Sequence, residues 1–124
     1  MAASAEQIHG VIEQYVARVA AGTTDEILEL FAEGATVEDP VGTEVRATRE
    51  AIREFYAGLE ELEQEGHLVT ARVAGGQAAF LFELATKAGD QTYTLAPIDV
   101  MTFDDDAKIT SMKAYWGDSD MTVS

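Results

Sequence analysis

The fold of this chain is decided by the stretch from His67 to Lys87, which reads HLVTARVAGGQAAFLFELATK. Apolar and polar residues alternate on both sides of Gly75-Gly76, which predicts two strands, 68–74 and 78–87, joined by a tight turn. Two more strands are predicted at 92–103 and 109–116, each after a short polar turn. Because these connections suit hairpins, we expect an antiparallel, meandering sheet.

The first half of the chain has helical periodicity instead. A capping box at 4–7 begins a predicted helix that ends at Gly22, and a second capping box at 23–26 begins one that extends to Gly34. Thr48 caps a third, whose acidic end over 60–65 is expected to be exposed and whose apolar stripe is Ile52, Phe55, Tyr56 and Leu59. The order predicts an α+β fold, with three N-terminal helices packed on a curved, mostly antiparallel sheet and a pocket between the layers.

Composition limits the partners of the protein. The chain has 124 residues, a net charge of −15 and 47% hydrophobic residues, which predicts one folded domain, 1–124, with a frayed tail over 117–124. Such acidity disfavours nucleic acid and anionic membranes and favours a neutral substrate, although it is also explained by solubility alone. There is no cysteine, no signal sequence and no membrane-length apolar stretch, so we expect a cytoplasmic protein.

Two carboxyl groups fall on otherwise apolar strand faces. Asp39 ends the run ATVEDP and shares a face with Val37, whereas Pro40 stops the strand and places this carboxyl at a rim. A turn-forming aspartate, and a cis bond before Pro40, are both open interpretations. Asp99 interrupts the run LAPIDVM without any Lys or Arg nearby in sequence. Unless a distant base pairs with it, desolvation keeps Asp99 protonated, and it then acts as a hydrogen-bond donor.

Tyr15 lies on the apolar stripe of the first helix, and its buried phenol needs a hydrogen-bond partner. Tyr56, on the inner side of the third helix, is the candidate, although both rings also fit a purely structural role in the core. His9 and His67 are isolated and have no ligand spacing around them, so no metal site is expected.

The segments around Tyr15, Asp39 and Asp99, together with AIREFY at 51–56 and AYW at 114–116, resemble the bacterial steroid Δ5-3-ketoisomerases, or ketosteroid isomerases. The resemblance runs from about Glu6 to Trp116. It implies a cone-shaped, nuclear-transport-factor-2-like fold, a homodimer, no cofactor and a 3-oxo-Δ5-steroid substrate. It also implies that Asp39 is the general base, and that Tyr15 and protonated Asp99 stabilise the dienolate oxygen.

An apolar pocket is expected to bind the rigid, neutral steroid by burial. Its predicted lining is Tyr56, Phe82, Leu84, Leu95, Met112 and Trp116. The sequence departs from some relatives at Phe31, where they carry a further tyrosine, so the hydrogen-bond network behind Tyr15 should be shorter.

Two other hypotheses about the function remain open. Another enzyme on the same cone, such as an epoxide hydrolase or a polyketide cyclase, would need extra polar groups to hold water or a charged substrate. A non-catalytic steroid or lipid carrier would have no need of Asp39 and Asp99 together.

Overall fold

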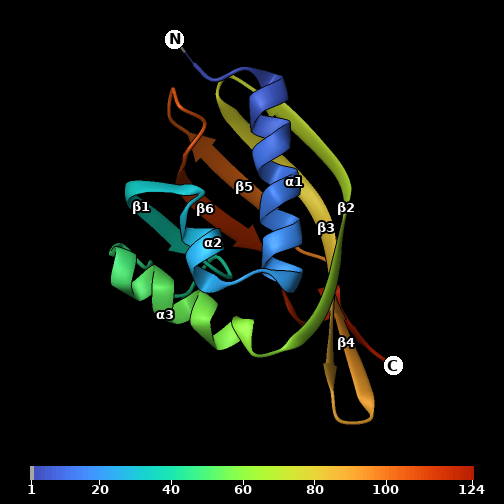
Figure 1. Cartoon of the computed structure of the whole chain (residues 1–124). Coiled ribbons are helices and arrows are strands. Elements are labelled where there is room, and N and C mark those ends of the chain that lie inside the picture. The colour runs from blue at the N-terminus through green and yellow to red at the C-terminus, as the bar shows by residue number, and fades with distance from the viewer. Residues whose placement is uncertain (1) are drawn as a thin grey trace.

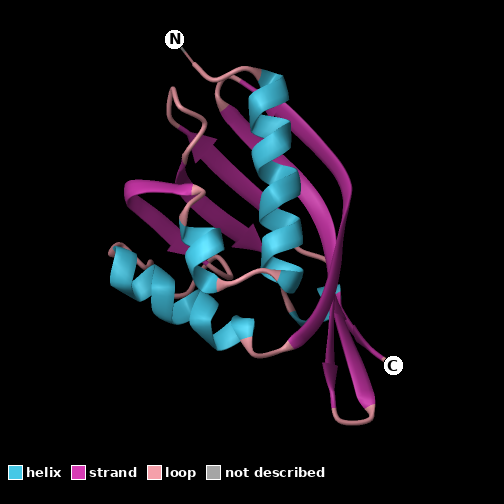
Figure 2. Cartoon of the chain, viewed as in Figure 1, coloured by secondary structure: helices cyan, strands magenta, loops and turns pink. Residues whose placement is uncertain are grey.

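The computed structural model describes residues 2–124, with helices on one face of a strongly curved sheet (Figures 1 and 2). The helices are α1 (Ala5–Ala21), α2 (Thr24–Leu28) and α3 (Arg49–Glu60), with a short 3-10 turn, η1, at Asp118–Asp120. The strands are β1 (Phe31–Glu38), β2 (Glu63–Ala74), β3 (Gln77–Ala88), β4 (Gln91–Leu95), β5 (Ile98–Phe103), β6 (Ile109–Tyr115) and β7 (Met121–Val123).

The sheet is mostly antiparallel but not a simple meander. Its strand order is β1-β6-β5-β3-β4-β7, with β2 paired to β3, and β1 pairs with β6 in parallel. β3 is long enough to pair with both β4 and β5 along successive parts of its length. The expected hairpin turn at Gly75-Gly76 has positive φ at both glycines, which a two-residue hairpin favours.

The predicted helix starts are confirmed. Ser4 and Thr23 each form a complete capping box, and the Thr48 side chain accepts from the backbone N–H of Ala51. Helix α1 buries one stripe against the concave face of the sheet, formed by Ile8, Ile12, Tyr15, Val16 and Val19. Each such aliphatic side chain stabilises the fold by about 1.5–3 kcal/mol.

The second helix is shorter than its sequence pattern predicts. It ends at Leu28, and Phe31 begins β1 instead of continuing the helix to Gly34. The backbone N–H of Ile109 donates to the carbonyl of Leu30 at 2.8 Å, so pairing with β6 starts where the helix was expected to continue. Leu30 and Phe31 are both buried, and an apolar pair of this kind fits a helix or a strand, so the long-range pairing decides between them.

Three other boundaries differ from the predictions. The single strand expected at 92–103 is divided at Ala96-Pro97 into β4 and β5, because Pro97 has no N–H for the ladder. The acidic segment after Glu60 starts β2 instead of extending α3. The tail does not fray, since β7 pairs with β4 and the amide of Ser124 donates to Thr92 at 2.9 Å. Within residues 2–124, no helix is both long and apolar enough to cross a membrane.

Candidate active site

A cavity of about 230 Å³ lies between the helices and the concave face of the sheet. Tyr15 from α1, Tyr56 from α3, Asp39 after β1, Asp99 from β5 and Trp116 after β6 all contribute to its wall. Five elements that are distant in sequence therefore bring four ionisable side chains and one indole together in a largely apolar space.

Asp99 lies at the dry end of this cavity. On β5 it is opposite Phe80 of β3 and Ala114 of β6, and the residue is only 1% exposed. Its Oδ1 has no hydrogen-bond partner, and no ion pair to Asp99 occurs among residues 2–124. Burial first, and then the charge of Asp39, raise the pKa of Asp99 well above its usual value. The protonated form is therefore favoured, and a protonated carboxyl can donate a hydrogen bond into the cavity.

Asp39 has a more polar environment than Asp99. It is only partly buried, and its Oδ1 accepts a hydrogen bond of 2.9 Å from Nε1 of Trp116. Burial is the largest effect and raises the pKa of Asp39 above its ordinary value, while the Trp116 bond and the charge of Arg46 lower it in part. These opposing effects favour an ionised Asp39 more than an ionised Asp99. The Asp39–Pro40 peptide bond is cis, one of the two isomers that the sequence left open.

Backbone hydrogen bonds and a cation–π contact fix the segment that carries Asp39. Val37 and Arg46 exchange backbone hydrogen bonds of 3.0 and 2.8 Å, and the amide of Val41 donates to the carbonyl of Ala114 at 2.8 Å. The guanidinium of Arg46 lies 4.4 Å from the ring centre of Phe55, whose side chain also lines the cavity. The Asp39 carboxyl is therefore held between the end of β1, the end of β6 and α3.

The phenols of Tyr15 and Tyr56 are joined by a hydrogen bond of 2.7 Å between their hydroxyl oxygens, which confirms the predicted pairing. Both rings are buried, and burial is the largest cause of the strongly raised pKa of each. Both therefore remain neutral hydrogen-bond donors. Phe31 packs edge-on against Tyr15 at 6.4 Å and contributes no hydroxyl, so the pair has no third tyrosine at this position.

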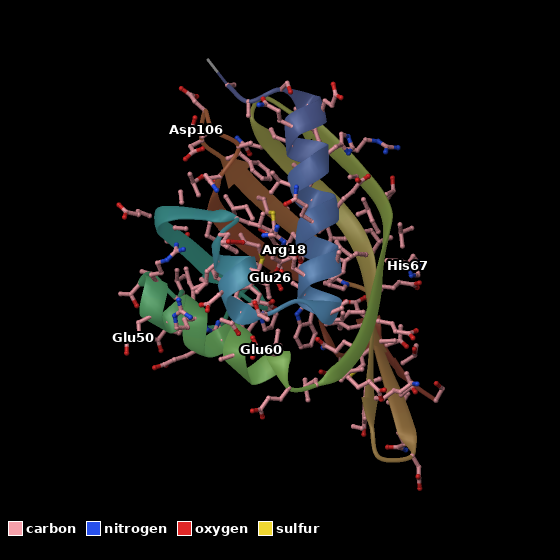
Figure 3. All side chains as sticks on the ribbon, viewed as in Figure 1. Arg18, Glu26, Glu50, Glu60, His67 and Asp106 are labelled. Carbon is pink, nitrogen blue, oxygen red and sulfur yellow. The ribbon has the colours of Figure 1, made fainter. Side chains whose placement is uncertain are left out.

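The position of Tyr15 depends on how α1 is anchored. Nη1 of Arg18 donates to the carbonyl of Glu26 at 2.6 Å, which ties the last turn of α1 to α2. Figure 3 labels both residues where these helices meet. Tyr15 is one turn before Arg18, and its ring also packs edge-on against Phe80 at 6.2 Å. The phenol is therefore restricted from both the helix side and the sheet side.

The predicted pocket residues lie in this cavity with one exception. Tyr56, Phe82, Leu84, Leu95 and Trp116 line it, whereas Met112 is 1% exposed in the hydrophobic core and pairs with Val37 and Met101. Alternation along β6 places Met112 inward, but its side chain fills the core and not the pocket. Nine further residues line the cavity and were not predicted from the sequence: Val19, Phe55, Leu59, Leu62, Gln64, Thr86, Tyr93, Pro97 and Met121.

Some of these omissions had a sequence signal. Phe55 and Leu59 belong to the apolar stripe of α3, and Tyr93 shares a strand face with Leu95. Met121 had none, because its position depends on the pairing of β7 with β4.

Two larger hollows, of about 810 and 620 Å³, are more open to solvent and contain none of the three predicted catalytic residues. The first lies beside Arg46 and the second beside His67, which Figure 3 places on β2. No group of three or more His, Cys, Asp or Glu side chains suited to a metal ion occurs within residues 2–124. The buried acids and phenols of the smaller cavity are therefore the strongest candidates for chemistry.

The chain is similar in sequence to known proteins. The SnoaL-like domain family matches residues 12–112. A steroid Delta-isomerase from Nocardioides simplex is 44% identical over 118 residues, which cover 95% of this chain and 96% of that protein.

Among solved structures, SalBIII is similar over 96% of this chain and 97% of its own, with a TM-score of 0.88 and 28% identity. SalBIII is described as an epoxide hydrolase/cyclase-like enzyme with a role in pyran ring formation in the polyether salinomycin. One fold therefore carries two different reactions, and the side chains in the cavity have to distinguish them.

Proposed function

Since this chain belongs to the SnoaL-like family and, within it, to the ketosteroid isomerases, we propose that it is a steroid Δ5-3-keto isomerase. It moves the C5=C6 double bond of a 3-oxo-Δ5-steroid into conjugation with the C3 carbonyl. The relationship to a steroid Delta-isomerase supports the isomerase class. The finer assignment of the reaction is based on the cavity.

The observation that carries this proposal is the contrast between the two acids of one cavity. Asp39 accepts a hydrogen bond from Trp116, which favours its ionised form as a base. Asp99 is dry and lacks a partner, which favours its protonated form as a donor. Proton removal beside a carbonyl requires both a base and neutral donors at the oxygen where negative charge develops.

The reaction then proceeds in two proton transfers. Asp39 removes a proton from C4, and the electron pair of that C–H bond forms the dienolate, with negative charge on O3. The hydroxyl of Tyr15 and the carboxyl of Asp99 donate hydrogen bonds to O3, and Tyr56 supports the Tyr15 phenol. Asp39 returns the proton to C6, which restores the carbonyl and leaves the conjugated Δ4 product. No proton is gained or lost overall, so no cofactor is required.

The direct test is incubation with a Δ5-3-ketosteroid while the ultraviolet absorbance of the conjugated enone is followed. We expect the initial rate of the absorbance rise to be proportional to the enzyme concentration. Absence of any rise at high enzyme concentration would reject the proposed reaction. If steroid binding nevertheless quenched the fluorescence of Trp116, the single tryptophan, a carrier function would be favoured.

The base assignment is tested by Asp39→Asn, which keeps an oxygen for the Trp116 bond but removes the base. We expect turnover to fall about 10²- to 10⁴-fold, the usual contribution of general base catalysis. Steroid affinity, measured by Trp116 quenching, should survive.

Tyr15→Phe and Asp99→Ala should each cost about 1–4 kcal/mol in transition-state stabilisation, as for loss of one oxyanion donor.

Asp106→Asn is the matched control for Asp39→Asn. Asp106, labelled in Figure 3, is exposed on the turn between β5 and β6 and does not line the cavity. The turnover of the Asp106→Asn variant should equal that of the wild type. Near-full turnover by Asp39→Asn would show that another group is the base.

An epoxide-opening reaction is the second candidate, favoured by the similarity to SalBIII. Protonated Asp99 would donate to the epoxide oxygen, and Asp39 would take the proton of the attacking hydroxyl or water. An epoxy-alcohol substrate offered in parallel separates the candidates, since an epoxide-opening enzyme should convert it and leave the ketosteroid unchanged.

A further inference from the structure

The cavity has a second polar region that the proposed chemistry does not use. Gln64 on β2, Thr86 on β3 and Tyr93 on β4 form a row across three strands, because Gln64 pairs with Thr86 and Thr86 pairs with Tyr93. All three line the same cavity as Tyr15 and Asp99. Building on the proposed isomerase function, we infer that Gln64 and Thr86 bind a hydroxyl group at the end of the steroid remote from the reacting carbonyl.

The strand register places this row opposite the reacting end. Phe80 of β3 pairs with Asp99, and Thr86 lies further along the same strand, beyond the cavity-lining Phe82 and Leu84. A rigid, elongated steroid whose C3 oxygen is held by Tyr15 and Asp99 therefore extends over these apolar side chains. Its ring D, or a side chain on that ring, points toward Gln64 and Thr86.

The hydrogen-bonding groups of the row are incompletely used. Nε2 of Gln64 donates to Oγ1 of Thr86 at 2.9 Å, whereas Oε1 of Gln64 is buried without a partner. Thr86 is the acceptor in this bond, so its own hydroxyl hydrogen is available to a ligand. Tyr93 differs, because its hydroxyl already donates to Gln91 at 2.9 Å, so its ring supplies apolar contact. The pair thus offers one unpaired acceptor and one free O–H donor.

This inventory favours a hydroxyl over a ketone. A ligand hydroxyl can accept from Thr86 and donate to Oε1 of Gln64 once the glutamine amide turns toward the cavity about its soft terminal torsion. A ligand ketone can only accept, so it leaves Oε1 unpaired in a buried setting, which is unfavourable. A ring D without oxygen satisfies neither group. We therefore expect about a tenfold preference in kcat/KM for the hydroxyl over the oxygen-free substrate.

The test compares Δ5-3-ketosteroids that carry a C17 hydroxyl, a C20 hydroxyl, a C17 ketone or no oxygen at that end. Each is assayed with the wild type, Gln64→Met and Thr86→Val, which retain size but remove hydrogen-bonding groups. The readout is the ratio of kcat/KM values between substrates, so a general loss of activity in a variant cancels. Gln77→Met, an exposed position at the start of β3 that does not line the cavity, is the matched control.

The expected result is a hydroxyl preference in the wild type and in Gln77→Met that falls to within about twofold in the other two variants. Equal kcat/KM for all substrates in the wild type, or an unchanged preference in both variants, would overturn the inference while leaving the isomerase function intact. If no ketosteroid is converted, the isomerase proposal fails, and Trp116 quenching by the same steroids decides the subsite separately. Equal affinities, or no binding, would then overturn it.

Discussion

Two carboxyl groups of this protein share a cavity but have different surroundings. Asp99 is almost fully buried and its Oδ1 lacks a hydrogen-bond partner. Asp39 accepts a hydrogen bond from Trp116 and is close enough to Arg46 for that charge to affect its pKa. These identities could be predicted from sequence, because each acid interrupts an alternating apolar strand pattern. The influence of Arg46 could not, since it depends on the bridge between Arg46 and Val37.

Arg46→Met tests this influence. The substitution keeps an apolar stem over Phe55 but removes the charge that lowers the pKa of Asp39. The pKa of Asp39 should rise, and because the base must be ionised, kcat/KM should begin to fall at a higher pH as the solution is acidified. The measurement is the pH profile of kcat/KM. Arg53→Met, which removes an exposed partner of Asp25, should leave the acidic limb in place; an equal shift in both variants would contradict the assignment.

Asp99→Asn tests the dry environment through stability. The folded-state pKa of Asp99 is raised, so the carboxyl is protonated in both states below its ordinary value of about 3.9. As pH rises from there toward the raised pKa, the unfolded chain ionises and the folded chain does not, so the free energy of unfolding falls. Asp99→Asn should flatten this fall, as measured by urea unfolding across pH. The exposed substitution Asp106→Asn should not flatten it.

At the scale of helices and strands, prediction succeeded where the signal is local. The caps of α1 and α3 and the Gly75-Gly76 hairpin depend on residues within a few positions of each other. It failed where distant pairing decides, as at Phe31, which the pattern of its neighbours suits to a helix but which pairs with Ile109 of β6. The same reason hid Met121 from the predicted pocket.

The tail is therefore expected to contribute to substrate binding. Strand β7 pairs with β4, and the amide of Ala96 donates to Asp120 at 3.0 Å, so a chain ending at Gly117 loses both supports and Met121 from the cavity wall. We expect KM to rise several-fold with a smaller change in kcat, because Tyr15, Asp39 and Asp99 lie on other elements. Steady-state kinetics measure both. Met121→Ala separates loss of the side chain from loss of the strand, and an unchanged KM in the shortened chain would contradict the prediction.

At the scale of the whole molecule, the helices cover only one face of the sheet (Figure 1). On the opposite face, Ile98 of β5 and Tyr115 of β6 are cross-strand partners, and each is 47% exposed. Val69 of β2 is 48% exposed. Neighbouring apolar side chains of this kind favour association with another protein surface. Together with the resemblance to homodimeric isomerases, they lead us to propose that a second copy of the chain packs here.

Sedimentation equilibrium tests this proposal. A dimer should have twice the 13.4 kDa chain mass, and Ile98→Lys should shift it toward the monomer, because a charge would be buried at the interface. Val41→Lys, at an exposed apolar position outside the strands, is the control and should remain dimeric.

Each chain carries a net charge of −15, so two copies repel, and added salt should strengthen the dimer by screening this repulsion. A wild type that remains monomeric at high protein and salt concentration would contradict the proposal. Dissociation by Val41→Lys instead of Ile98→Lys would move the interface to the edge that carries the Asp39 segment.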